Sequence, residues 1–160
     1  MPLNAALEGK CYPELLYEVG REKLREFARA AGETAPVYHD EQAARAAGYR
    51  DLPAFPTFPI VLSNRVFELA CADPDLGLDC RMIVHGEQEF AFERPIFAGD
   101  RLRAQGVLAS IRSRGRHEIL IVETVIRAEE NGSGGETVCV GRSTIVSRDS
   151  GQRASTLVRR

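Results

Sequence analysis

The stretch LPAFPTFPIVLSNRVFELACA, residues 52–72, decides the fold of this chain. Its prolines all lie at or before Pro59, at positions where a helix can begin but through which it cannot continue. From Ile60 to about Ala72, apolar residues occupy most sides of the predicted helix. A helix that is apolar on most sides is normally buried, so we expect this one to lie in the core.

Two shorter helices are predicted before this stretch. Apolar residues recur at helical spacing through REKLREFARAAG, residues 21–32, and Gly32 is a natural C-terminal stop. Asp40 is well placed to cap the N-terminus of a second helix, DEQAARAAGY, which Gly48 ends. The segment GETAPVYHDE connects these helices and carries an acid and a histidine.

From Cys80 onward the pattern changes to strands joined by short turns. The strands are predicted at 81–96, 101–113, 117–130 and 136–148, with NGSGG as a loop before the last. Strands linked so tightly pair antiparallel, which predicts an α+β fold: one sheet wrapped around one buried helix. Residues 119–125 are apolar on both faces, so we expect a central strand whose outer face a second copy or a partner covers.

Composition limits the classes of function. The 160 residues are 44% hydrophobic and 28% charged, with a formal net charge of -2, which favours neither nucleic acid nor a membrane surface as partner. The longest apolar run is too short to span a bilayer, and no secretory signal is recognised, so a cytoplasmic protein is expected. We expect one domain over residues 1–148 and a mobile tail over 149–160.

The four cysteines are widely spread, with no C-x-x-C and no paired Cys/His spacing. Zinc sites normally carry such pairs, so no metal site is expected. We expect Cys11, Cys71, Cys80 and Cys139 to be free buried thiols that act as small apolar residues.

Three segments resemble the MaoC-like hotdog-fold dehydratases, in the branch related to the amino-terminal half of fungal-type fatty-acid-synthase dehydratase regions. They are residues 17–49, LPAFPTFP and HGEQEFAFERPIFAGDRL. The resemblance implies a hotdog fold, dimers built on a continuous sheet, and acyl thioesters of coenzyme A or a carrier protein as ligands. It also implies reversible hydration of a trans-2-enoyl thioester to the (R)-3-hydroxyacyl thioester, without metal or cofactor.

The connecting loop departs from the family pattern G-D-x-N-P-x-H, in which Asp and His are the catalytic pair. Gly32 and Pro36 match, whereas Glu33 occupies the Asp position and Ala35 the Asn position. Tyr38 occupies the His position, and a phenol with a pKa of about 10 is a poor proton acceptor near neutrality.

His39 comes one residue after the base position. In an extended loop adjacent side chains point in opposite directions, so we expect His39 to face away from Tyr38 as a surface residue beside Asp40. A local rearrangement would instead let it act with Glu33.

His85 lies in a predicted strand. Alternation places it on the face of Glu87 and Glu89, opposite Phe90, as a sheet-face or interface residue, with a catalytic role as the alternative. Gly86 inside this strand predicts a bulge or a close backbone approach.

The segment before the buried helix is the expected contact for the thioester. The backbone N–H groups of Phe55, Thr57 and Phe58 are candidates to bind its carbonyl oxygen, and Thr57 is also a candidate cap of the helix. On the resemblance alone, Phe55 and Phe58 would line an acyl tunnel. The basic run RSRGR, residues 112–116, is expected to be a solvated turn, with attraction of a carrier phosphate as the alternative.

Three functions follow as hypotheses. The chain is a substrate-binding subunit that lacks the catalytic histidine and forms a heterodimer with a catalytic hotdog partner. Alternatively it is a self-sufficient homodimeric hydratase that uses Glu33 with His39 or His85. The third hypothesis is a non-catalytic acyl-thioester binding protein.

Overall fold

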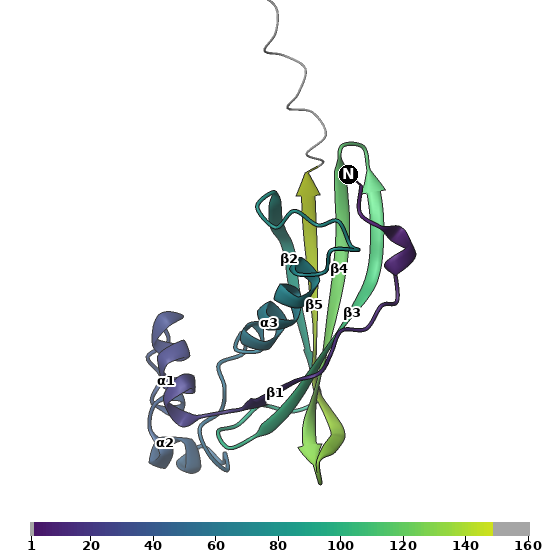
Figure 1. Ribbon diagram of the computed structural model, residues 1–160. Helices are drawn as coiled ribbons and strands as arrows, with labels where there is room; N and C mark the ends of the chain where they lie inside the picture. The colour runs from purple at the N-terminus through teal and green to yellow at the C-terminus, as the bar shows by residue number, and fades with distance from the viewer. Residues whose placement is uncertain (1, 149–160) are drawn as a thin grey trace, which may run out of the picture.

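One antiparallel sheet carries the helix α3 (Ile60–Cys71) across one face, as Figure 1 shows. The computed structural model describes residues 2–148, and the expected tail at 149–160 lies outside the described residues. The other elements are η1 (Ala5–Leu7), β1 (Leu15–Glu18), α1 (Arg21–Ala30), η2 (Pro36–Tyr38), α2 (Glu41–Ala46), β2 (Ile83–Phe92), β3 (Arg101–Arg114), β4 (His117–Glu130) and β5 (Ser133–Arg148). The predicted α+β arrangement with one buried helix is confirmed.

The strands lie in the order β1-β3-β4-β5-β2, and every neighbouring pair is antiparallel. The predicted central strand is β4, flanked by β3 and β5. Its even-numbered residues Leu120, Val122 and Ile126 are buried, while Ile119 and Ile121 on the opposite face remain half-buried. The short strand β1 was not predicted, and it leaves β1 and β2 as the two edges of the sheet.

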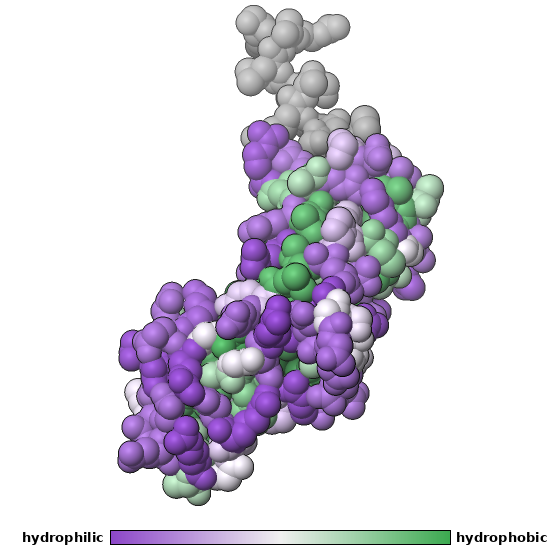
Figure 2. Space-filling model, turned by 60° about the horizontal axis from the view of Figure 1, so that its bottom comes forward, coloured by the Kyte–Doolittle hydropathy of each residue, from purple (hydrophilic) through white to green (hydrophobic). Residues whose placement is uncertain are grey.

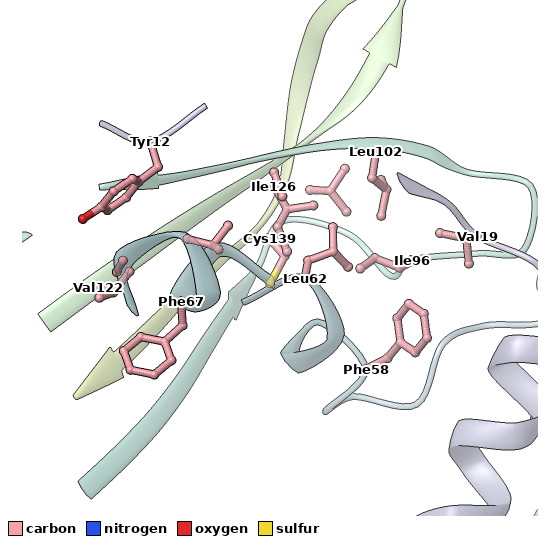
Figure 3. Close-up of a cluster of buried hydrophobic side chains, with 14 of the residues drawn as sticks. Tyr12, Val19, Phe58, Leu62, Phe67, Ile96, Leu102, Val122, Ile126 and Cys139 are labelled. Carbon is pink, nitrogen blue, oxygen red and sulfur yellow. The ribbon is translucent and has the colours of Figure 1, made fainter. Parts of the chain in front are cut away.

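The core lies between α3 and the sheet. Figure 3 shows side chains from the loop before α3 and from the helix meeting side chains from the strands. The helix buries Leu62, Val66 and Ala70, and Phe58 just before it is fully buried. Because both layers contribute apolar side chains, the helix is held by burial and not by its own propensity.

Gly106 allows α3 to lie close to the middle of β3. A Cβ atom built at this position would be 2.1 Å from Cγ1 of Val66 and 3.7 Å from the ring of Tyr12. Real Cβ atoms do not approach other atoms so closely, so any larger residue here has to displace Val66 or push the helix away.

We expect Gly106→Ala to lower the free energy of unfolding by about 1–3 kcal/mol, because it overpacks the helix–sheet contact. Urea unfolding followed by circular dichroism measures the change. In a Val66→Ala background the cost should be smaller, since the clashing methyl groups are gone. The exposed strand glycine Gly134, whose nearest neighbour is the flexible side chain of Arg127, supplies the control Gly134→Ala. Equal costs at Gly106 and Gly134 would contradict the proposed close contact.

The first residues of the chain form a strap along β3. The amides of Gly9 and Tyr12 donate to the carbonyl oxygens of Leu108 and Gly106, both at 2.8 Å. Further back, the amide of Leu3 donates to the buried carboxylate of Glu118 at 2.5 Å. The strap therefore extends the pairing of β1 toward the far end of the sheet.

The strap is also fixed to the loop that follows α3. Asp73 accepts hydrogen bonds from Nζ of Lys10 at 2.6 Å and from the hydroxyl of Tyr12 at 3.0 Å. The amide of Asn4 donates to the carbonyl oxygen of Leu76 at 3.1 Å. The N-terminal segment thus connects β3 to the loop at the C-terminal end of α3.

The loop predicted at NGSGG is wrong in extent. Only Asn131 and Gly132 form the turn, with φ of 50° and 82°, and β5 begins at Ser133. Two successive residues with positive φ match the right-handed twist of a hairpin, which is why an Asn-Gly pair closes it so tightly. Within residues 2–148, no helix is long and apolar enough to cross a membrane.

The expectation of four free buried thiols is wrong for three cysteines. Cys71 and Cys80 form a disulfide, because the loop after α3 turns back and places their Cα atoms 5.9 Å apart. Cys11 is free but exposed. Cys139 is the buried free thiol, and burial raises its pKa to about 12.

We expect reduction of the Cys71–Cys80 disulfide to lower the free energy of unfolding by about 2–3 kcal/mol, because a bridge over a loop of this length restricts the unfolded chain. Urea unfolding with and without dithiothreitol measures the change. The matched control is Cys71→Ser/Cys80→Ser, whose unfolding midpoint should not respond to the reductant. A reductant response of equal size in both proteins would refute this contribution.

Candidate functional site

The loop between α1 and α2 is a tight turn rather than an extended segment. Gly32, with φ of 78°, ends α1, and Pro36 begins η2, a 3-10 helix of one turn. The amides of His39 and Asp40 both donate to the carbonyl oxygen of Pro36, at 3.0 and 2.8 Å. Proline fixes its own φ at a value suited to such a turn, and this overrides the extended conformation assumed from the sequence.

Two side chains of this loop stabilise it internally. Oε1 of Glu33 accepts a hydrogen bond from the amide of Ala35 at 2.7 Å. Oδ1 of Asp40 accepts one from the amide of Ala43 at 2.7 Å, which confirms Asp40 as the cap of α2. The carboxylate at the family's acid position is therefore held close to the loop backbone.

The side chain of His39 folds back toward the start of the loop and is half-buried, whereas a surface position was predicted for it. Its Nε2 lies 2.8 Å from the carbonyl oxygen of Glu33, and its own carbonyl oxygen accepts from Nε of Arg25 at 2.8 Å. A carbonyl oxygen only accepts hydrogen bonds, so Nε2 carries a proton in this geometry. This leaves Nδ1 as the ring atom free to accept one.

Tyr38 packs against the segment before α3. Its ring meets the ring of Phe55 edge to face, with centroids 5.5 Å apart. Burial first, and then the negative charge of Glu33, raises the pKa of the Tyr38 phenol. The group in the family's base position is thus a protonated donor near neutral pH.

The segment before α3 contributes one buried ring and two available amides. Phe58 is fully buried and packs against Phe27, with centroids 5.4 Å apart, so it belongs to the core. Its amide donates to the carbonyl oxygen of Phe55 at 2.8 Å. Among residues 2–148, no hydrogen-bond partner is found for the amides of Phe55 and Thr57. The N-cap residue of α3 is Pro59, and no side-chain hydrogen bond caps this helix. The side chain of the exposed Thr57 therefore does not cap α3, contrary to the prediction.

A pocket of about 330 Å³ lies beside this segment. Its lining is mostly apolar and joins the loop before α3 to the end of β2: Ala54, Pro56, Phe92, Glu93, Arg94, Pro95 and Ile96. Phe92 is 41% exposed. The charge of Arg94 is balanced by Asp100 at 2.8 Å and by Glu136 at 2.6 Å. The exposed Glu93 forms no ion pair among residues 2–148, so its carboxylate is the free charge of the lining.

The sequence did not predict that the residues after β2, Glu93 to Ile96, line a pocket. The only signal available was their place in the third segment of the resemblance, between HGEQEF and the turn FAGD. Figure 2 shows hydrophobic surface gathered in the middle of the molecule, between polar outer parts.

His85 is not on the face predicted for it. Its ring meets Phe67 of α3 with centroids 5.6 Å apart, so it points to the helix side, as Phe90 does. The predicted bulge at Gly86 is confirmed by the register shift between His85 and Glu87, and it reverses the alternation on which the prediction relied. Val84, which precedes His85 and projects from the opposite face of β2, is 62% exposed.

The structure brings Glu33, Tyr38 and His39 together with Phe55, but it keeps His85 apart from them. In Figure 1 the start of β2 lies at the end of the sheet far from α1 and α2. Within one chain His85 therefore does not reach the loop at 33–39. No group of three or more metal-binding side chains is found in the described part of the chain.

Comparisons with known proteins agree on one group. The family described as the FAS1-like dehydratase domain region matches residues 6–134. A UPF0336 protein of Saccharopolyspora erythraea is 46% identical over 149 residues, covering 92% of this chain and 93% of the relative.

Two solved structures are similar in both sequence and fold. The C-terminally truncated HadBC (3R-hydroxyacyl-ACP dehydratase) complex of Mycobacterium tuberculosis gives a TM-score of 0.76 at 30% identity, covering 88% of this chain and 97% of that one. A MaoC-like dehydratase gives 0.80 at 28% identity, covering 91% of this chain but 43% of the longer protein. The fold is the hotdog fold predicted from the sequence.

We expect the raised pKa of Tyr38 to be visible in an ultraviolet titration of the folded protein. Wild-type protein should contain tyrosines that ionise above pH 10.0, the ordinary value, and Tyr38→Phe should remove one of them. Because the pKa of Tyr38 is higher in the folded than in the unfolded state, the phenol's contribution to stability is fully present below the unfolded-state pKa. That contribution is lost as the pH rises through the folded-state pKa. Tyr17→Phe is the control, because the charge of Tyr49 itself contributes to the raised pKa of Tyr38. An unchanged late-ionising group in Tyr38→Phe would refute the assignment.

Proposed function

The chain belongs to the family of FAS1-like dehydratase domain regions, and from this we propose that it is the substrate-binding component of an enoyl-thioester hydratase, equally a 3-hydroxyacyl-thioester dehydratase, which acts with a catalytic partner of the same fold. Its ligand is an acyl thioester of coenzyme A or of a carrier protein. The reaction adds the hydroxyl group of water to the β-carbon of the enoyl thioester and a proton to the α-carbon. It needs no metal or redox cofactor.

The chemistry requires a group that accepts a proton from water as its oxygen attacks. A carboxylate and an imidazole at hydrogen-bond distance from that water are suited to this, because their pKa values can be placed near the working pH. The thioester oxygen gains negative charge in the transition state, so N–H donors directed at it lower the barrier.

The observation that carries the proposal is Tyr38 in the base position. Its phenol is kept protonated by burial and by the charge of Glu33, so it donates rather than accepts near neutral pH. The neighbouring imidazole of His39 commits Nε2 to the carbonyl oxygen of Glu33. This chain therefore retains a carboxylate at the acid position but carries a phenol instead of an imidazole at the base position, while the imidazole of His39, one residue later, is bound through Nε2 to the loop backbone.

Elements for binding a thioester are nevertheless retained. The amides of Phe55 and Thr57, without partners among residues 2–148, are available donors for the thioester oxygen. The apolar pocket beside Pro56 and Phe92 is suited to part of an acyl chain. Binding without a complete catalytic pair is the combination expected of a non-catalytic subunit.

The partner is proposed to pair along β2. This ten-residue strand is an edge of the sheet, so its outward backbone groups have no strand beside them within the described chain. The structural relative HadBC is itself a complex, which supports a heteromeric arrangement here. A paired β2 edge also places the partner next to the pocket at Phe92.

We expect the isolated protein to hydrate crotonyl-CoA at least about 100-fold more slowly than its complex with the catalytic partner, because a missing general base costs 10²- to 10⁴-fold in rate. Loss of the enoyl absorbance measures the rate. A hotdog protein encoded beside this one, with the intact G-D-x-N-P-x-H loop, is the partner to co-purify.

Variants separate the three hypotheses. In the complex, Glu33→Ala in this chain should change the rate little, as should the exposed control Glu26→Ala on α1. Robust turnover by the isolated chain that is lost in His39→Ala or His85→Ala would establish a self-sufficient homodimer instead. Tight binding of butyryl-CoA with no turnover in any complex would identify a binding protein.

A further inference from the structure

Asp100 carries a buried carboxylate that has no part in the proposed reaction. It immediately precedes β3 and is only 7% exposed. Its Oδ2 accepts hydrogen bonds from the amide of Phe97 at 3.0 Å and from Nη1 of Arg94 at 2.8 Å. Its Oδ1 accepts one from Nη2 of Arg50. Burying a charge is costly unless it is paired and hydrogen-bonded, and this carboxylate is paired with two arginines.

The two arginines belong to opposite walls of the pocket of about 330 Å³ at the candidate site. One wall is formed by residues 92–96 and contains Arg94, whose side chain is 25% exposed. The other wall is formed by Ala54 and Pro56, and Arg50 lies shortly before it in the chain. The carboxylate between the arginines therefore connects both walls.

Backbone bonds bring the same two walls together beside the carboxylate. The amide of Ala54 donates to the carbonyl oxygen of Ile96 at 2.7 Å, and an isolated antiparallel bridge joins Pro53 to Phe97. Figure 3 shows that the side chain of Ile96 points into the core. The amide of Asp100 donates to the carbonyl oxygen of Phe97 at 3.1 Å, so the paired stretch ends in a closed turn.

Arg50 is held by an aromatic ring as well as by the carboxylate. Its guanidinium carbon lies 4.9 Å from the centroid of the Phe97 ring, and the ring of Tyr49 lies 5.9 Å from the same ring, centroid to centroid. A cation over an aromatic face is attracted by the electrons of the ring. The two contacts hold Arg50 in place although its side chain is 59% exposed.

We propose that Asp100 is a positioning residue of the acyl pocket. Through Arg94 and Arg50 it holds the two walls at the separation at which the pocket accepts an acyl chain. Asp100 does not itself line the pocket, so it acts through these partners. The inference rests on the proposed function, in which the acyl group of a thioester enters this pocket.

A role of Asp100 in folding alone is the alternative, because removing one member of a buried ion pair destabilises a protein. The two roles change different quantities. A carboxylate that only stabilises the fold alters the urea midpoint. A carboxylate that positions the walls also alters the affinity gain, which is the ratio of the dissociation constants of acetyl-CoA and hexanoyl-CoA.

The test measures this affinity gain by isothermal titration calorimetry with the full chain. Neither saturated ligand can be hydrated, so binding is observed without turnover. The longer acyl chain buries more apolar surface, so we expect hexanoyl-CoA to bind the wild type at least about tenfold more tightly than acetyl-CoA. In Asp100→Asn the gain should fall below about threefold, while the dissociation constant of acetyl-CoA should change less than about twofold.

Asparagine is a suitable replacement because it keeps the size of the side chain and one oxygen for the amide of Phe97, but it carries no charge to pair with the arginines. Arg50→Met tests the same connection from the other side and remains available if Asp100→Asn does not fold. It should lower the gain as well, and it should add little in the Asp100→Asn background, since both changes break one contact.

Arg81→Met is the matched control. It also removes an arginine–aspartate ion pair, with Asp79 at 2.9 Å, but in Figure 1 the start of β2 lies at the end of the sheet far from α1 and α2. Its affinity gain should equal that of the wild type. Circular dichroism and the urea midpoint verify that each variant is folded.

The inference is overturned if the wild type binds neither ligand, or binds both equally. It is also overturned if the folded variants keep the gain of the wild type, even where their urea midpoints are lower. The hydration assay reports on the proposed function separately. An active complex whose variants keep the gain rejects the role of Asp100 alone, and a lost gain in an inactive complex rejects the proposed function alone.

Discussion

The close approach of α3 to the middle of the sheet is the contact on which the rest of this structure depends. It is possible because Gly106 presents no side chain to Val66. With the helix at this distance, its start fixes the direction of the segment that carries Phe55 and Thr57. The same segment meets Tyr38 through the Phe55 ring, so the position of the loop at 33–39 also follows from the helix–sheet contact.

The loop itself is held by many weak bonds rather than by burial. Arg25 bonds to the carbonyl oxygen of His39, Glu33 to the amide of Ala35, and His39 to the carbonyl oxygen of Glu33. Each bond adds about 1 kcal/mol or less at a half-exposed position, and all three stabilise the same turn. A side chain in such a loop has little freedom to change its partner, which is why the identity of residue 38 matters so much.

Local patterns predicted the regular elements well. The apolar run after Pro59 gave α3, Asp40 gave the cap of α2, and the doubly apolar stretch at 119–125 gave the central strand. These features depend on neighbours in the sequence, where periodicity and capping act directly.

The errors involve features that depend on position in space. The Cys71–Cys80 disulfide requires the path of the loop after α3, and His85 changes face because the bulge at Gly86 inserts one residue into the alternation. The turn at Pro36 replaced an extended loop because backbone bonds from His39 and Asp40 converge on one carbonyl oxygen. The positions of Glu33 and Tyr38 in the site were predicted by the resemblance, and spacing alone would not have paired them with Phe55.

The N-terminal strap sets the order in which this chain can complete its fold. Leu3 bonds to Glu118, 115 residues later in the chain, and Gly9 bonds to Leu108. During synthesis residues 3–12 emerge long before these partners, so the strap has nothing to pair with until β3 and β4 have formed. Contacts so distant in sequence slow folding, because a long loop has to close before they contribute. The strap at residues 3–12 can therefore dock only after β3 and β4 have formed.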